Sequence, residues 1–142
     1  MPIKWTINHD RRLVIAVCGD TVSRTDIEDY LDKVVVGDAL PYAKLFDIAD
    51  ATLALDGDDM MALGARIRAY AGISDLGPLA LVAASPEGHD KARQFAVLAG
   101  ANRPIRIFSK LSSAERWLAA AAGDDDRPVG PRPRLRSLLL AL

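Results

Sequence analysis

Five aspartates in the middle of the chain are the residues whose types and spacing come closest to a chemical site. They are Asp47, Asp50, Asp56, Asp58 and Asp59. Carboxylates gathered at the carboxyl ends of strands could hold a hard cation such as Mg²⁺, or accept a phosphoryl group as the aspartate of a receiver domain does. The other interpretation is helix capping, in which Asp56 or Asp58 binds free backbone amides and its neighbours favour the positive end of the helix dipole. Capping alone explains the acids at this spot, so we favour it.

Histidine, cysteine and serine residues do not form a recognisable catalytic or metal-binding pattern. His9 and His89 are far apart, and neither has a second histidine or cysteine at the spacing of a metal site. Cys18 is the single cysteine and is expected to point into a sheet as a small hydrophobe. Ser85 precedes His89 closely, but it lacks a Gly-x-Ser-x-Gly elbow and a helix cap explains it. We therefore expect no enzyme activity, no metal ion and no cofactor.

Composition limits the class of protein further. The 142 residues suffice for one domain, and 50% hydrophobic against 26% charged residues supports a packed core. A net charge of -1 gives no basic surface for nucleic acid. The single cysteine excludes an internal disulfide, and the sequence shows neither a signal peptide nor an apolar run of bilayer length. We therefore expect a soluble, cytoplasmic protein without a transmembrane segment.

Apolar runs and turn signals predict about five strands and about four helices. The strands are expected at residues 3–7, 13–18, 42–48, 79–84 and 104–108. The helices are expected at 23–37, 56–72, 85–99 and 112–121. Strands that alternate with helices favour a parallel sheet, because each return in the same direction needs a helical crossover. The predicted fold class is therefore α/β: a single domain with a mostly parallel sheet and an antiparallel first strand.

Short polar motifs mark the expected helix starts. Ser23–Asp26 and Thr25–Glu28 both have the spacing of a capping box for the first helix. Ser85, followed by proline, is expected to cap the third helix, and Ser112–Glu115 the fourth. Between the third strand and the second helix, a polar and acidic loop is expected at residues 49–55.

Residues 123–142 differ in composition from the rest and are expected to form an appendage to a domain at 1–122. The stretch 127–142 holds four arginines, no acidic residue and a leucine-rich end. Its charge of +4 contrasts with -5 for residues 1–126, so it could fold back onto the acidic domain. The alternatives are a segment on a membrane surface, a helix docked in a groove, and a loosely packed extension.

Four segments in a fixed order carry a likeness to a known family. Val17–Asp20 closes the second expected strand, Leu45–Asp50 closes the third, and Asp56–Asp59 opens a helix. With the passage Phe108–Leu118, these segments resemble a STAS domain of the SpoIIAA-like kind over about residues 3–122. That family includes bacterial anti-sigma-factor antagonists and the cytoplasmic domains of sulfate transporters. The resemblance implies a SpoIIAA-like fold and regulation by switching between protein partners.

The loop that carries a phosphoserine in such switches differs here from the family pattern. Phospho-switch members resemble one another in a serine near the start of the second helix, where this chain has Gly57, Asp58 and Asp59. No serine lies between Arg24 and Ser74, and the aspartates already place fixed negative charge at this position. We therefore expect regulation by binding alone, without a phosphoserine.

The favoured function is a non-enzymatic, regulatory protein-interaction module that uses the acidic loop and the second helix. The expected partner-binding residues are Asp56, Gly57, Asp58, Asp59, Met60 and Met61. The aspartates would form a polar rim and the methionines an apolar part, since methionine suits adaptable interfaces. The resemblance implies a regulatory kinase or an anti-sigma-like protein as the partner, and a homodimer stays open.

A small-molecule binding domain is the alternative function. Open α/β sheets bind ligands in the crevice at the carboxyl ends of their strands. A lipid or nucleotide bound there would need a pocket lined by residues near Asp47, Asp50 and Ser85. The presence and place of a pocket therefore distinguish the two functions.

Overall fold

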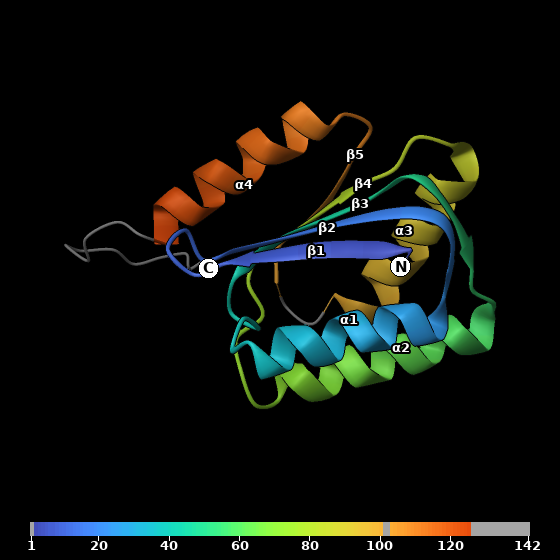
Figure 1. Cartoon of the computed structure of the whole chain (residues 1–142), viewed down its shortest axis with the longest axis horizontal. Coiled ribbons are helices and arrows are strands. Elements are labelled where there is room, and N and C mark those ends of the chain that lie inside the picture. Colours follow the sequence, from blue (N-terminus) through green and yellow to red (C-terminus); the bar gives the residue numbers. More distant parts are fainter. Residues whose placement is uncertain (1, 101–102, 126–142) are drawn as a thin grey trace.

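The computed structural model describes residues 2–100 and 103–125, which form one α/β domain (Figure 1). The amino-terminal half contains β1 (Ile3–Asn8), β2 (Leu13–Ser23), α1 (Arg24–Val36), β3 (Ala43–Ala54) and α2 (Gly57–Ala71). The remainder contains β4 (Leu79–Val82), α3 (Pro86–Ala99), β5 (Ile105–Phe108) and α4 (Leu111–Asp125). The expected order of strands and helices is confirmed. Helix α4 continues three residues beyond the expected domain boundary, and the rest of the expected tail lies outside the described residues.

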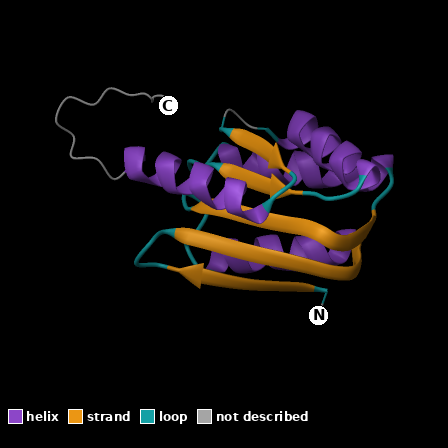
Figure 2. Ribbon diagram, turned by 90° about the horizontal axis from the view of Figure 1, so that it is seen from above, coloured by secondary structure: helices purple, strands orange, loops and turns teal. Residues whose placement is uncertain are grey.

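The strands lie side by side in chain order, from β1 at one edge to β5 at the other. β1 pairs antiparallel with β2, and every later pair is parallel, as predicted. Parallel crossovers are right-handed, so three crossovers that advance the same way along the sheet place their helices on one face. Helices α1, α2 and α3 therefore share one face, while α4 covers the other (Figures 1 and 2).

β2 and β3 are longer than the sequence predicted. The expected loop at 49–55 is mostly strand, because β3 continues to Ala54 and pairs with the end of β2 from Gly19 to Ser23. The pairing shifts register between Val17 and Gly19 and then resumes. Pairing across the two extensions satisfies their backbone groups, and Val22 becomes fully buried. The prediction failed here because this pairing joins segments distant in the chain.

Local capping motifs explain where the helices begin. Of the two boxes proposed for α1, the structure uses Ser23: its hydroxyl accepts a hydrogen bond from the Asp26 amide at 3.3 Å, and the Asp26 carboxylate accepts one from the Ser23 amide at 2.9 Å. Ser85 caps α3 as predicted, accepting from the Gly88 amide at 2.9 Å. The prediction for α4 is wrong, because that helix begins at Leu111 and Ser112 lies inside its first turn.

Hydrophobic side chains pack on both faces of the sheet. On the α4 face, Leu45, Ala80 and Val82 contact Ala114 and Leu118. The opposite face carries the larger cluster, to which the buried residues Val14, Ala16, Cys18, Val22, Tyr30, Val34, Ile48 and Leu63 belong. Successive strand residues alternate between the two faces, which accounts for this division.

Helix α2 packs mainly on α3 and less on α1, and it stands farther from the strands than either of them. Gly64 permits the close approach to α3: a Cβ atom at this position would lie 2.9 Å from the Leu98 carbonyl oxygen. Arg68 donates a hydrogen bond to the same oxygen. The packing of α2 on α3 therefore requires glycine at residue 64, because a side chain there would collide with the Leu98 carbonyl group.

Two identical substitutions in α2 test this contact. We expect Gly64→Ala to lower the free energy of unfolding by about 1–3 kcal/mol, because overpacking against a backbone outweighs the better helix propensity of alanine. Gly57→Ala is the matched control, since a Cβ there would meet nothing within 4 Å. It should leave stability unchanged or raise it by up to about 1 kcal/mol. Urea denaturation measures both values, and equal effects of the two variants would contradict the packing described.

Cys18 provides a second test of the core. Its side chain is 1% exposed, and burial raises the pKa of its thiol to about 12, with Asp47 and Asp26 adding to the increase. The reactive thiolate should therefore be absent at pH 8. We expect no reaction with a chromogenic disulfide reagent in the native protein and full reaction in concentrated urea. Rapid reaction under native conditions would show that the core is open at Cys18.

Candidate functional site

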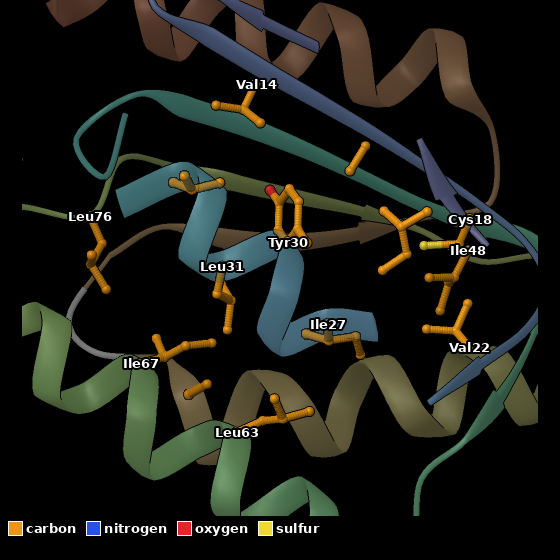
Figure 3. Packing of buried hydrophobic residues seen from close by; sticks show 14 of the residues in the cluster. Val14, Cys18, Val22, Ile27, Tyr30, Leu31, Ile48, Leu63, Ile67 and Leu76 are labelled. Atoms are coloured by element: carbon orange, nitrogen blue, oxygen red, sulfur yellow. The ribbon is translucent and has the colours of Figure 1, made fainter. Parts of the chain in front are cut away.

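A cavity of about 70 Å³, partly open to solvent, lies between the sheet and helices α1, α2 and α3. Its wall is almost wholly apolar and includes Leu31 of α1, Phe46 of β3, Met60 and Ile67 of α2, and Phe95 of α3. Figure 3 shows part of this region, with Tyr30 directed from α1 toward the sheet and Ile67 directed from α2 toward α1. Because α2 stands away from the strands, side chains of the other two helices fill the intervening layer incompletely.

The volume has an energetic consequence. Side chains that line an unfilled volume lose the dispersion contacts that close packing would give them, which lowers the stability of the folded domain. An apolar cavity offers water few hydrogen bonds, and such cavities bind apolar molecules readily. A ligand that fills the space would recover part of this loss.

Lys44 is a buried cation in the cavity wall. It lies in β3, is 5% exposed, and donates hydrogen bonds from Nζ to the carbonyl oxygens of Leu40 and Tyr42, the latter at 2.8 Å. Burial lowers the pKa of Lys44 well below its usual value, and the positive charge of Arg103 lowers it further. Two carbonyl acceptors orient the Lys44 amino group and favour its charged form, which burial and Arg103 disfavour.

Arg103 brings a second positive charge to the same wall. Its Nε atom is buried and has no hydrogen-bond partner among the described residues. Burial lowers the pKa of Arg103 to about 10, and the nearby Tyr30 opposes this decrease. Burial likewise raises the pKa of Tyr30 above its ordinary value, which Arg103 counteracts. An unpartnered buried N–H group costs about 1–3 kcal/mol. The hydrogen bonding of the Arg103 guanidinium is therefore incomplete among the described residues.

Lys91 of α3 is the third cation in the wall, and its environment differs. Its Nζ donates a hydrogen bond to the carbonyl oxygen of Leu55, just before α2. It therefore ties α3 to the carboxyl end of β3, whereas Lys44 lies at the amino end of that strand.

The cavity is not where the sequence placed a ligand crevice. The prediction used the carboxyl ends of the strands near Asp47, Asp50 and Ser85, whereas the cavity lies under the sheet. Asp47 alternates with Phe46, which lines the cavity, so it faces the α4 side. Its carboxylate accepts a hydrogen bond from the Ala49 amide at 2.9 Å.

The cation site considered as an alternative for the aspartates is not formed either. Asp47 and Asp50 belong to the extended β3, and Asp56–Asp59 come only after that strand ends. Within residues 2–100 and 103–125, no three His, Cys, Asp or Glu side chains are placed to hold a metal ion. Helix capping explains Asp56–Asp59, which is the interpretation that the sequence analysis favoured.

Asp56 and Asp59 form a reciprocal capping box at the start of α2. The Asp56 carboxylate accepts from the Asp59 amide at 2.8 Å, and Asp59 accepts from the Asp56 amide at 3.0 Å. The hydrogen bond from the Asp59 backbone is the main cause that lowers the pKa of Asp56. Asp59 also lies 3.6 Å from the guanidinium of Arg24. Asp58 is exposed beside them.

The two methionines of the expected partner surface face in opposite directions. Met60 is 1% exposed and lines the cavity, so its assignment to an outer surface is wrong. It lies on the same helical stripe as Leu63 and Ile67, which carries it inward. Met61 is 62% exposed and stays available on the outside.

The remaining candidates do not converge on one site. His9 Nδ1 lies 2.7 Å from the Tyr42 hydroxyl, and His89 Nε2 lies 3.3 Å from the hydroxyl of Ser109. The hydroxyl of Ser85 accepts from the Gly88 amide and so serves the helix start.

The sequence interpretation missed Lys44 and Arg103. Lys44 did give a signal, because it is the one charged residue between Tyr42 and Phe46 in an otherwise apolar strand. Strands of parallel sheets are covered on both faces, so a lysine inside one is expected to be buried. Arg103 gave no such signal, because it lies in a short polar connection before β5, where an exposed arginine is expected.

Comparisons with known proteins identify the fold. No protein-family model matches the sequence, and no curated protein sequence matches it significantly. A crystal structure of an uncharacterized DUF3478-family protein with a SpoIIAA-like fold, from Shewanella loihica, is similar with a TM-score of 0.55 and 17% sequence identity. The match covers 82% of this chain and 91% of that chain. The chain therefore has the SpoIIAA-like fold that its sequence resembled.

No helix within the described residues is long and apolar enough to cross a membrane.

Proposed function

We propose that the domain is a non-enzymatic, cytoplasmic binding protein that takes a small, largely apolar molecule into the cavity beneath its sheet. The observation that carries the proposal is the cavity itself, with its apolar wall and its position between three helices and the strands. This is the small-molecule function considered from the sequence, now assigned to a different place in the fold.

The polar groups of the wall support binding without chemistry. A buried lysine with a lowered pKa could serve as a nucleophile, but two carbonyl groups hold the Lys44 ammonium in place. Lys91 is engaged by the Leu55 carbonyl. General acid–base catalysis needs a titratable group within hydrogen-bond reach of the reacting atom and with a pKa near the working pH. Histidine meets the pKa requirement most often, but neither histidine of this chain lines the cavity.

A pair of alanine-to-leucine variants tests the cavity. Ala92 of α3 is 2% exposed and lines it, so Ala92→Leu should fill part of the space. Titration with 1-hexanol, followed by the NMR signal of the Met60 methyl group, should show saturable binding in the wild type. Ala92→Leu should weaken that binding about tenfold or more, or about 1.4 kcal/mol.

Ala65→Leu is the matched control, because Ala65 is exposed on α2 and lies outside the cavity wall. It should bind 1-hexanol as the wild type does. Absence of a Met60 response in the wild type, or equal weakening by both variants, would refute the cavity as a binding site.

Regulatory protein binding is the second candidate function, and the exposure of Met61 next to Asp58 favours it. An exposed apolar side chain with a carboxylate beside it fits a small interface whose partner offers a basic residue and an apolar pocket. The partner suggested by the family resemblance is a regulatory kinase or an anti-sigma-like protein. Met60 and Met61 belong to the same turn, so the two candidate surfaces meet at the start of α2.

A double substitution tests the outer surface. Asp58→Lys/Met61→Asp reverses charge and polarity there, and both side chains are exposed, so the fold should persist. We expect a partner captured from a lysate of the source cells by the wild type to be lost by this variant. Glu87→Lys/Val97→Asp makes matched changes at exposed positions of α3 and should retain the partner. If both variants capture the same proteins, the proposed surface is wrong. The same holds if both variants capture only a second copy of this chain.

A further inference from the structure

Among the described residues, the cavity wall carries positive charge at Lys44 and Arg103 without a matching negative charge. None of the ion pairs among the described residues involves Lys44 or Arg103. Removing a cation from water is costly unless an anion or good hydrogen bonds replace the lost hydration. Lys44 has two carbonyl acceptors, whereas the Arg103 Nε has no partner among the described residues.

The two cations lie at the same edge of the sheet. Lys44 pairs with Leu79 across β3 and β4, and Leu79 pairs with Ile105 across β4 and β5. Arg103 stands two residues before Ile105, so both charges lie at the amino ends of these strands. The positive charge of Arg103 lowers the pKa of Lys44, which indicates that the two groups interact. One anion placed there would interact favourably with both.

The opposite end of the cavity is apolar. Leu53 and Met60 line it near the end of β3 and the start of α2. Lys91 is nearby, but its ammonium is engaged by the Leu55 carbonyl. The lining therefore runs from a charged end at Arg103 to an apolar end at Met60.

Building on the proposed function, we propose that the ligand is a small amphipathic monocarboxylate, whose carboxylate binds Arg103 beside Lys44 and whose alkyl chain lies along the cavity toward Met60. A guanidinium group binds a planar carboxylate through two parallel N–H donors. The Nε of Arg103, which has no partner among the described residues, could be one donor of such a pair. A volume of about 70 Å³ favours a short, unbranched chain and a compact head group.

The experiment compares ligands that share a chain and differ in head group. Hexanoate, 1-hexanol and hexyl phosphate are titrated into the full-length protein, with binding read from the Met60 methyl signal. We expect hexanoate to bind about tenfold more tightly than 1-hexanol, because a hydrogen bond to a charged group contributes about 1.5–3 kcal/mol. Hexyl phosphate should bind more weakly than hexanoate because of its larger head.

Two variants locate the head group. Arg103→Met keeps an apolar stem and should reduce the hexanoate-to-hexanol ratio to about one. Lys91→Met tests the other cation of the wall, and the ratio should persist because the Leu55 carbonyl engages its ammonium. Arg106→Met, at an exposed position of β5 outside the wall, is the matched control and should also retain the ratio. All three variants are first checked for cooperative thermal unfolding, and the wild-type ligand comparison stands without any of them.

Each outcome bears on a definite claim. Equal binding of hexanoate and 1-hexanol by the wild type would overturn the carboxylate while leaving the cavity as an apolar site. Tighter binding of hexyl phosphate would overturn the assigned head group. Loss of the ratio in Lys91→Met but not in a folded Arg103→Met would overturn the assigned place. If neither hexanoate nor 1-hexanol binds, the proposed function fails and this inference fails with it.

Discussion

The fold depends on how three helices share one face of a five-stranded sheet. Successive right-handed crossovers place α1, α2 and α3 on that face, and α2 packs on its neighbours farther from the strands. Gly64 allows α2 to approach the backbone of α3 closely, so that α2 still closes this layer. The cavity is a consequence of this arrangement, because only side chains span the distance between α2 and the strands.

Two unfavourable features coincide in that space: an unfilled volume and a partly exposed arginine whose buried Nε has no hydrogen-bond partner among the described residues. Each is unfavourable for the folded domain, because lost packing contacts and an unpaired buried donor both cost free energy. A bound molecule with an apolar chain and an anionic head would relieve both. On the α4 face, by contrast, Leu45 and Leu118 belong to one packed apolar cluster.

Features encoded within a few residues could be predicted from the sequence, and features that depend on distant segments could not. Ser23 and Ser85 were identifiable as caps because their partners lie three residues away. The extension of β3 to Ala54 required knowledge of its pairing with β2. Met60 could have been assigned to the core, since it shares the helical spacing of Leu63 and Ile67. Arg103 gained significance only when folding brought it to Lys44, so no local pattern revealed it.

An isotope-filtered NMR experiment that records contacts between hexanoate protons and protein methyl groups would locate the ligand. If hexanoate binds in the cavity as proposed, its terminal methyl shows nuclear Overhauser effects to Met60 and Leu53, and its other end contacts Leu79, close to Lys44 in the sheet. Contacts confined to exposed side chains such as Met61, or no contacts at all, would contradict this proposal.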